Sequence, residues 1–156
     1  MKIDKFFLLS LIAPVFTNAL GTKASTSPLL GVDEIILINL KRRQDRLQLF
    51  KQRSHLTDDQ FTRLEAFDGK LLRWNEELDK IFRDNTVLWH APEIGCAMSH
   101  LSVWKRIASS NCKLCLVLED DALFSDGWID TWNHEYYPDL PQNKFASILY
   151  FFFFSF

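Results

Sequence analysis

The chain has 156 residues, which is enough for about one domain. Its composition, 47% hydrophobic and 24% charged, is that of a globular protein and excludes a disordered or fibrous chain. Lys and Arg number 18 against 20 Asp and Glu. The resulting net charge of −2 excludes a strongly basic nucleic-acid binder, because no excess of cations is available to displace phosphate counterions.

The first 19 residues predict a secretory signal peptide. Two lysines give a positive start, residues 6–16 are mostly apolar, and small residues precede an expected cleavage after Ala19. The apolar stretch is too short to span a bilayer, which takes about 20 residues. The alternative, a buried N-terminal helix, would not need this order of segments. Residues 20–31 follow as an expected linker that is largely small and polar.

Between this leader and the C-terminus, strand and helix patterns alternate. The expected strands are residues 32–39, the imperfectly alternating 61–66, 114–118 and 145–150. The expected helices are residues 41–54, 74–82, 92–109 and one that begins within 126–132. Strands separated by helices predict an α/β domain with a largely parallel sheet, which we place at residues 32–150.

The last six residues, FFFFSF, do not fit this pattern. Four consecutive phenylalanines have no period that would place apolar groups on one side and polar groups on the other. We therefore expect the natural sequence to end at about Tyr150 and residues 151–156 to be a non-native tail.

The helix expected at 92–109 has the clearest pattern. Pro92 suits the first turn, and Glu93 is favoured there by the helix dipole. Six residues recur at helical spacing and are expected to share one face: Cys96, Ser99, His100, Val103, Trp104 and Ile107. On such an apolar face, His100 and Ser99 are by default packing residues rather than ligands.

Polar side chains follow two of the expected strands. Asn39 ends the first strand and precedes the basic stretch 41–46 (KRRQDR), and the acidic triplet 119–121 (Glu-Asp-Asp) follows the strand at 114–118. In open α/β sheets, ligands bind beyond the carboxyl ends of the strands. If the strands are parallel, both groups emerge at the same edge, and cations face three carboxylates across one crevice.

Together these groups fit a metal-bound nucleoside diphosphate. Adjacent carboxylates repel one another, and a divalent cation with oxygen ligands, Mn²⁺ or Mg²⁺, offsets that repulsion. Arginine matches phosphate oxygens bidentately. Each group also has an ordinary explanation when taken alone. The triplet could be a solvated turn in which Asp121 caps a helix, and the basic stretch a solvated helix face with pairs such as Arg42 and Asp45.

Three cysteines leave one unpaired in a monomer, and two of them form the sequence Cys112-x-x-Cys115. A zinc site would need a second ligand pair, which the sequence does not show. The pair also precedes a strand instead of opening a helix, which disfavours a thioredoxin-like role. We therefore assign it no function.

Four motifs occur in a fixed order between residues 32 and 150. They are Ile38-Asn39-Leu40-x-Arg42-Arg43-x-Asp45-Arg46, Glu65-Ala66-x-Asp68-Gly69, Glu93-x-Gly95-Cys96-x-x-Ser99-His100 with Trp104, and Leu118-Glu119-Asp120-Asp121. This ordered set resembles glycosyltransferase family 25, although no single motif would be specific. The family includes bacterial lipooligosaccharide galactosyltransferases and animal procollagen hydroxylysine galactosyltransferases. The basic opening of this chain is more similar to the second group.

The resemblance implies a GT-A fold, Rossmann-like, with a mostly parallel sheet and flanking helices, of which this chain would carry the N-terminal, nucleotide-sugar-binding half. It implies a UDP-sugar donor, usually UDP-galactose, dependence on Mn²⁺ (or Mg²⁺), and inversion at the sugar carbon. The implied acceptor is a hydroxyl of a protein or glycan, such as collagen hydroxylysine. The endoplasmic reticulum lumen is the implied location and agrees with the signal peptide, and we expect no transmembrane span.

The resemblance also implies a set of site residues. Asp121 and Glu119 are expected to bind the metal, because the acidic triplet stands where the family has its Asp-x-Asp-like motif. The residues expected to line the UDP-sugar pocket are Asn39, Arg42, Arg43, Asp68, Ser99, His100, Glu119 and Asp120. A complete GT-A domain needs roughly twice the folded length available, so we expect the general base and the acceptor site to be missing.

Two other functions compete with this one. A non-catalytic secreted relative, or a donor-binding fragment, would bind UDP without turnover. An unrelated metal-dependent hydrolase built on the acidic triplet would be active without nucleotide, and the arginine-rich stretch after the first strand argues against it.

Overall fold

The structure, a computed structural model, describes residues 27–83, 90–140 and 147–150. The expected signal peptide, the first residues of the expected linker and the expected tail at 151–156 lie outside these ranges. Within them, no helix combines the length and the apolar composition that crossing a membrane requires.

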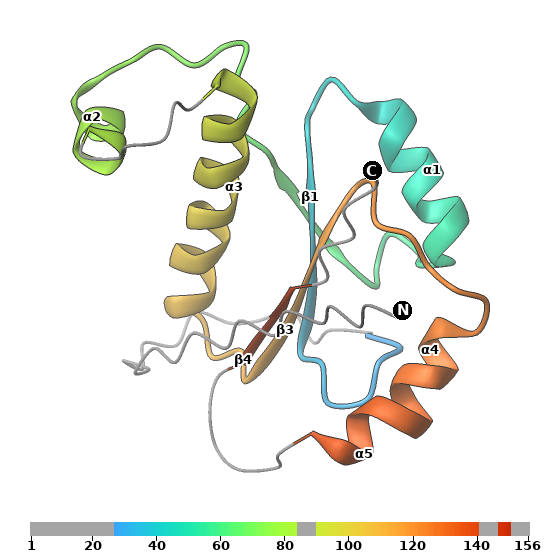
Figure 1. The fold of residues 1–156 in the computed structure, drawn as a ribbon. Coiled ribbons are helices and arrows are strands. Elements are labelled where there is room, and N and C mark those ends of the chain that lie inside the picture. Colours follow the sequence, from blue (N-terminus) through green and yellow to red (C-terminus); the bar gives the residue numbers. More distant parts are fainter. Residues whose placement is uncertain (1–26, 84–89, 141–146, 151–156) are drawn as a thin grey trace, which may run out of the picture.

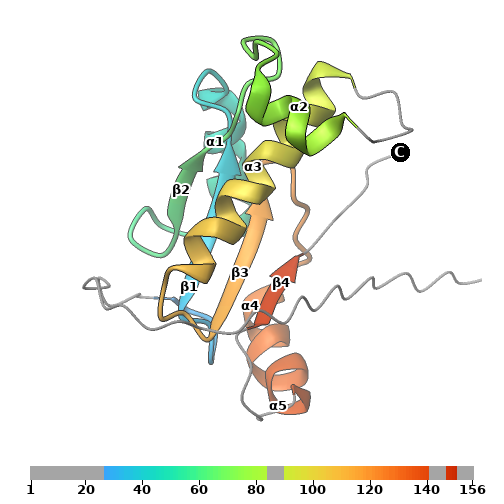
Figure 2. The same ribbon diagram turned by 90° about the vertical axis from the view of Figure 1, so that its left-hand side faces the viewer.

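A parallel sheet forms the centre of the domain. Its strands are β1 (Glu34–Asn39), β2 (Thr62–Glu65), β3 (Leu114–Glu119) and β4 (Ser147–Tyr150). They lie in the order β2-β1-β3-β4, and every neighbouring pair is parallel, as Figure 2 shows. The expected α/β domain with a largely parallel sheet is therefore confirmed, and each expected strand coincides with an observed one apart from its ends.

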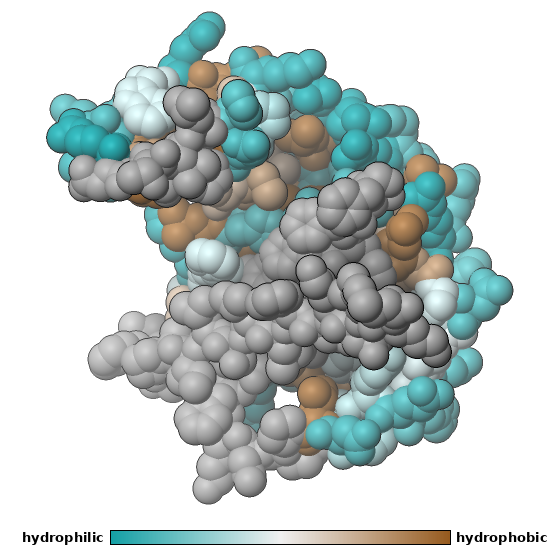
Figure 3. All heavy atoms as spheres, in the orientation of Figure 1, coloured by the Kyte–Doolittle hydropathy of each residue, from teal (hydrophilic) through white to brown (hydrophobic). Residues whose placement is uncertain are grey.

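Helices cover both faces of the sheet (Figure 1). One face carries α3 (Ala91–Ala108), against which α2 (Glu76–Phe82) packs. The other carries α1 (Gln44–Ser54) and a run made of α4 (Trp128–Thr131), the π-helical η1 (Trp132–Tyr136) and α5 (Tyr137–Asp139). Hydrophilic side chains predominate on the outer surface of α1 (Figure 3), as expected for a helix that turns one face to a core and the other to water.

The alternation of side chains along β1 divides the core into two layers. Ile35 and Leu37 pack toward Phe50 of α1, whereas Ile36 and Ile38 pack toward Val103 of α3. All six side chains are nearly or fully buried. Because successive residues of a strand point to opposite faces, the same rule decides where the polar residues at the strand ends are directed.

The structure corrects the predicted face of α3. Four of the six residues expected on it are buried, but Cys96 and Trp104 are exposed. The helix packs in two directions, because Val103 and Ile107 contact the sheet while Ile94 and Met98 contact α2. The buried residues of α3 therefore cover two directions and do not form the single stripe that the spacing predicts.

Two helices begin later than expected. The α2 helix begins at Glu76 and not at 74, because the Asn75 side chain caps it by accepting a hydrogen bond from the Leu78 N–H (3.0 Å). The α1 helix begins at Gln44 and not at 41, since the Arg43 N–H donates to the Leu40 carbonyl (2.9 Å) in a preceding turn. Residues 41–43 therefore lie in the connection beyond the carboxyl end of β1.

Part of the expected linker packs on the domain. Leu29 is buried in the core on the α1 face, and the Trp132 indole donates to the Leu30 carbonyl (3.0 Å). Asn133 accepts a hydrogen bond from the Leu30 N–H (2.7 Å). These contacts attach residues 29–30 to η1.

Candidate functional site

The end of β3 directs two carboxylates to opposite faces of the sheet. Glu119 lies on the α3 face, like Val117, and its Oε1 is 2.9 Å from His100 Nε2. Asp120 follows on the α1 face, where its Oδ1 accepts a hydrogen bond from Arg46 Nη1 (3.1 Å). The acidic triplet is thus divided between two helices and does not point in one direction.

Asn39 joins the ends of β1 and β3. Its amide Nδ2 donates to Asp120 Oδ2 (2.6 Å) and to the Arg43 carbonyl (3.1 Å). Asn39 is 1% exposed and Asp120 is 7% exposed, and the Asn39 Oδ1 atom has no hydrogen-bond partner among the described residues. The prediction that the two polar groups meet at one edge of the sheet is confirmed by these contacts.

The arginines after β1 are already paired. Arg42 hydrogen-bonds Asp68, in the loop after β2, and this hydrogen bond lowers the pKa of the Asp68 carboxyl. Arg43 binds Asp45 (2.6 Å from Nη2 to Oδ2) and lowers its pKa to about 2, mainly through that hydrogen bond. The pair expected between Arg42 and Asp45 is not formed, because Arg43 takes the place of Arg42.

Asp121 is the most open of the three carboxylates. Its side chain is 58% exposed, and its Oδ2 is 3.6 Å from Arg46 Nη1. Desolvation raises the pKa of Asp121, and repulsion from Glu119 and Asp120 raises it further. A cation bound here would stabilise a negative charge that the surroundings disfavour.

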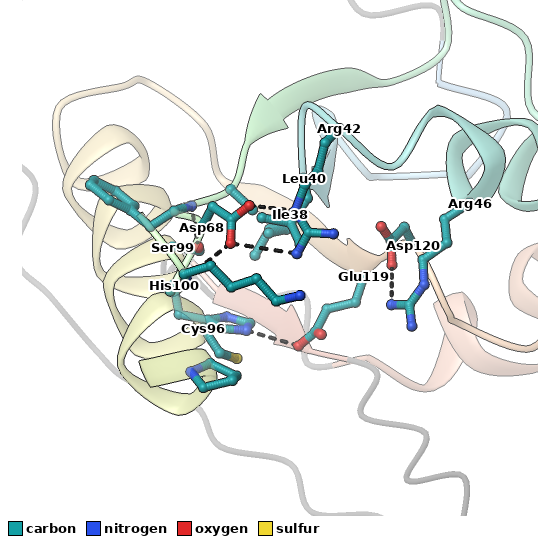
Figure 4. A pocket seen from close by; sticks show the side chains of 15 residues that line it. Ile38, Leu40, Arg42, Arg46, Asp68, Cys96, Ser99, His100, Glu119 and Asp120 are labelled. Atoms are coloured by element: carbon teal, nitrogen blue, oxygen red, sulfur yellow. Dashed lines mark hydrogen bonds and ion pairs between the residues drawn. The ribbon is translucent and has the colours of Figure 1, made fainter. Parts of the chain in front are cut away.

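A cleft lies at this edge of the sheet, between the connection after β1, the loop after β2 and α3 (Figure 4). Six of the expected site residues line it: Arg42, Asp68, Ser99, His100, Glu119 and Asp120. Asn39 supports Asp120 from the sheet, whereas Arg43 and Asp121 are not among the lining residues. The cleft therefore brings together most, but not all, of the expected set.

Close backbone packing holds the loop after β2 against α3. The Ser99 hydroxyl accepts a hydrogen bond from the Phe67 N–H (2.9 Å) and donates to the Gly95 carbonyl (2.6 Å). A Cβ on Gly69 would lie 1.9 Å from the Ala91 carbonyl oxygen, and one on Gly95 would lie 2.6 Å from the Phe67 oxygen. Ser99 therefore positions the wall of the cleft, and both glycines permit this close approach.

His100 is a cationic group in the wall of the cleft. Burial alone would lower its pKa, but hydrogen bonding to Cys96 and Glu119 outweighs burial and raises the pKa to about 9. The imidazole is therefore protonated near neutral pH. The default expectation of a packing histidine is incomplete, since His100 is buried but also pairs with Glu119 in the wall of the cleft.

Among the lining residues with a charged or thiol side chain, three were not expected from the sequence: Arg46, Lys70 and Cys96. Cys96 could have been found, since it precedes His100 by one helical turn. A further feature, the disulfide between Cys112 and Cys115, joins the loop before β3 to the second residue of that strand. Neither of its cysteines lines the cleft, and Cys96 is the free cysteine. The Cys-x-x-Cys spacing allowed this bond but did not predict it.

An α/β domain with a charged cleft beyond the carboxyl ends of parallel strands is an arrangement that binds nucleotides in Rossmann-like and GT-A-like proteins. Residues 32–147 match the family model described as glycosyltransferase family 25 (LPS biosynthesis protein). The chain therefore belongs to glycosyltransferase family 25.

Curated relatives are similar to the chain over a shorter length than the family model. Procollagen galactosyltransferase 2 of Mus musculus is 38% identical over 103 residues, and that of Homo sapiens is 36% identical over the same length. Each alignment covers 61% of this chain and 16% of the relative. A putative glycosyltransferase, R655, of Acanthamoeba polyphaga mimivirus is 40% identical over 97 residues, which are 58% of this chain and 29% of the relative. No solved structure matches the chain.

Proposed function

We propose that this chain contains the donor-binding part of a glycosyltransferase that transfers a hexose, in the first place galactose, from a UDP-sugar to a hydroxyl of a protein or glycan. Family membership supports glycosyl transfer, and the names of the procollagen galactosyltransferases support the sugar and a collagen-type acceptor. The chain spans about a sixth of the length of those relatives. We therefore propose the transfer reaction for a longer protein that also contains the remaining part of such a sequence.

The observation that carries the proposal is the cationic lining of the cleft at the carboxyl ends of β1 and β3. Arg42, Arg46 and Lys70 line it together. Asp68 and Asp120 hold the two guanidinium groups in place by hydrogen bonds. Oriented arginines can bind the oxygens of a diphosphate bidentately, and the carboxylates that orient them reduce the conformational entropy lost on binding.

The residues at this edge fit a divalent metal in part. Asp121 offers an exposed carboxylate whose raised pKa indicates a need for a counter-ion. Asp120 already accepts hydrogen bonds from Asn39 and Arg46. Glu119, the second expected metal ligand, is paired with His100. We therefore propose that Asp121 binds Mn²⁺ or Mg²⁺, with Glu119 joining only if it leaves His100. When bound, such an ion supplies Lewis-acid stabilisation of the departing UDP.

The residues of the cleft act mainly on the leaving group. Arg42, Arg46 and Lys70 would neutralise the negative charge that develops on UDP as the glycosidic bond breaks. In an inverting transfer, the acceptor hydroxyl attacks the sugar carbon from the opposite face and gives its proton to a base. We assign no base to the described residues. We also propose, from the leader sequence, that the protein acts in the secretory pathway, in the endoplasmic reticulum lumen.

Calorimetric titration of UDP, with and without Mn²⁺, tests this proposal. We expect the chain to bind UDP in the presence of Mn²⁺ and Asp121→Ala to weaken that binding by at least about tenfold, which corresponds to about 1.4 kcal/mol. Asp126→Ala, which removes another exposed carboxylate a few residues away, is the matched control and should retain wild-type affinity.

The results separate the alternatives. Absence of UDP binding by the wild-type chain would overturn the donor-site proposal, and binding that is equal with and without Mn²⁺ would overturn the metal assignment. UDP binding by a longer protein without turnover of UDP-galactose would favour a non-catalytic relative. Hydrolytic activity that needs a metal but no nucleotide would favour the hydrolase.

A further inference from the structure

A cluster of three side chains with metal-binding atoms lies on the α3 side of the cleft. The Sγ atom of Cys96, a ring nitrogen of His100 and a carboxylate oxygen of Glu119 all lie within 4.8 Å of one another. Figure 4 shows the three side chains gathered at one end of the cleft, and all three line it. Asp121, the metal ligand of the proposed donor site, is not part of this cluster.

The fold places these ligands on rigid elements. Cys96 and His100 are one turn apart on the 18-residue helix α3, and Glu119 is the last residue of β3. His100 is 7% exposed, and its Nε2 is 2.9 Å from Glu119 Oε1. Cys96 is exposed and is not part of the disulfide. In this cluster His100 and Glu119 are already in contact with each other, and the third ligand, Cys96, is accessible to solvent.

We propose that Cys96, His100 and Glu119 form a site for a thiophilic divalent cation, in the first place Zn²⁺, with one coordination position open to the cleft. Thiolate and imidazole ligands select Zn²⁺ over Mn²⁺ and Mg²⁺, which prefer oxygen ligands. Three protein ligands and one open position are the arrangement of reactive zinc sites. Asp121 takes no part in this site, which needs no nucleotide, and while Glu119 binds the zinc it is not available to the ion proposed at Asp121.

The geometry requires only a small adjustment. Zinc bonds of about 2.0–2.3 Å place the ligand atoms of a tetrahedral site roughly 3.5 Å apart. Glu119 and His100 are already closer than that. Rotation of the exposed Cys96 side chain can close the remaining gap. As the ion binds, the Cys96 thiol and the His100 imidazolium each release one proton, and the ion replaces the proton between His100 and Glu119.

Cobalt titration without nucleotide tests the site. Co²⁺ replaces Zn²⁺ in such sites and gives a thiolate-to-cobalt charge-transfer band in the near ultraviolet. With the Cys112–Cys115 disulfide intact, we expect this band in the wild-type chain, and we expect Zn²⁺ but not Mn²⁺ to abolish it. Cys96→Ser should remove the band and weaken Co²⁺ binding about 100-fold or more, because even changes next to a metal ligand cost 10–100-fold. Asp121→Asn is the control and should keep the band.

Two results would overturn the proposal: a wild-type chain without the band, or a band of equal intensity in Cys96→Ser. Since Cys96 is exposed, its replacement leaves the core unchanged. Glu119→Gln provides a second variant, in which binding should weaken while the band from Cys96 persists at saturating Co²⁺. Circular dichroism of each variant verifies the fold. Failure of UDP binding in the calorimetric experiment would not affect these outcomes.

Discussion

Gly69→Ala is expected to lower the free energy of unfolding by about 3 kcal/mol, the upper range for overpacking a tight site. The added methyl group would lie 1.9 Å from the carbonyl oxygen and 2.4 Å from the carbonyl carbon of Ala91. These are backbone atoms at the first residue of α3, so the overlap cannot be relieved by turning a side chain. The loop after β2 must move away from the helix, and with it Asp68, which holds Arg42.

Thermal unfolding and UDP titration together measure this effect. We expect a melting temperature lower by roughly 10 °C, and weaker UDP binding because Arg42 loses its fixed position. Gly127→Ala is the matched control. Its Cβ would meet no atom within 4 Å, but the residue has a φ of +69°, so the cost is the left-handed backbone conformation, about 1–2 kcal/mol. It should lose stability and keep UDP affinity. A Gly69→Ala variant with wild-type stability would show that the loop is not held as described.

The fold could be predicted largely because the strands are buried on both faces. Residues 34–39 and 114–119 are nearly continuous apolar runs, which are typical of parallel strands between two layers of helices. The helix positions were harder to predict. The apolar stripe of α3 did not show that the helix packs against both the sheet and α2. For this reason Cys96 was expected on the buried face of the helix but is exposed.

The site could be predicted in its position but not in its pairings. Parallel strands fix which residues reach the same edge, and the contact of Asn39 with Asp120 follows from that rule. The sequence does not show that Glu119 and Asp120 turn to opposite faces, because this depends on where β3 ends. Nor does spacing show that Arg42 reaches Asp68, a contact made across the loop after β2 and not along the helix.

The stability that His100 contributes is expected to disappear as the pH rises. Its pKa is raised from 6.5 to about 9 in the folded protein, so the folded state holds the proton more tightly than the unfolded chain. This contribution is present in full below pH about 6.5 and is lost as the pH rises through about 9. The full shift corresponds to about 3 kcal/mol at 1.36 kcal/mol per pKa unit. Because the cleft is open to solvent, we expect a value nearer 2 kcal/mol.

Urea unfolding of the wild-type chain and of His100→Gln, in a metal-chelating buffer, measures this difference. The wild-type chain should exceed the variant in stability by about 2 kcal/mol at mildly acidic pH, and the excess should vanish above pH about 9. His134→Gln, which removes an exposed histidine of η1, controls for the loss of a histidine in general. An excess that is constant with pH would mean that His100 stabilises the domain by packing alone. An excess that falls with pH would show that the charged pair with Glu119 joins α3 to the end of β3, where the cleft is built.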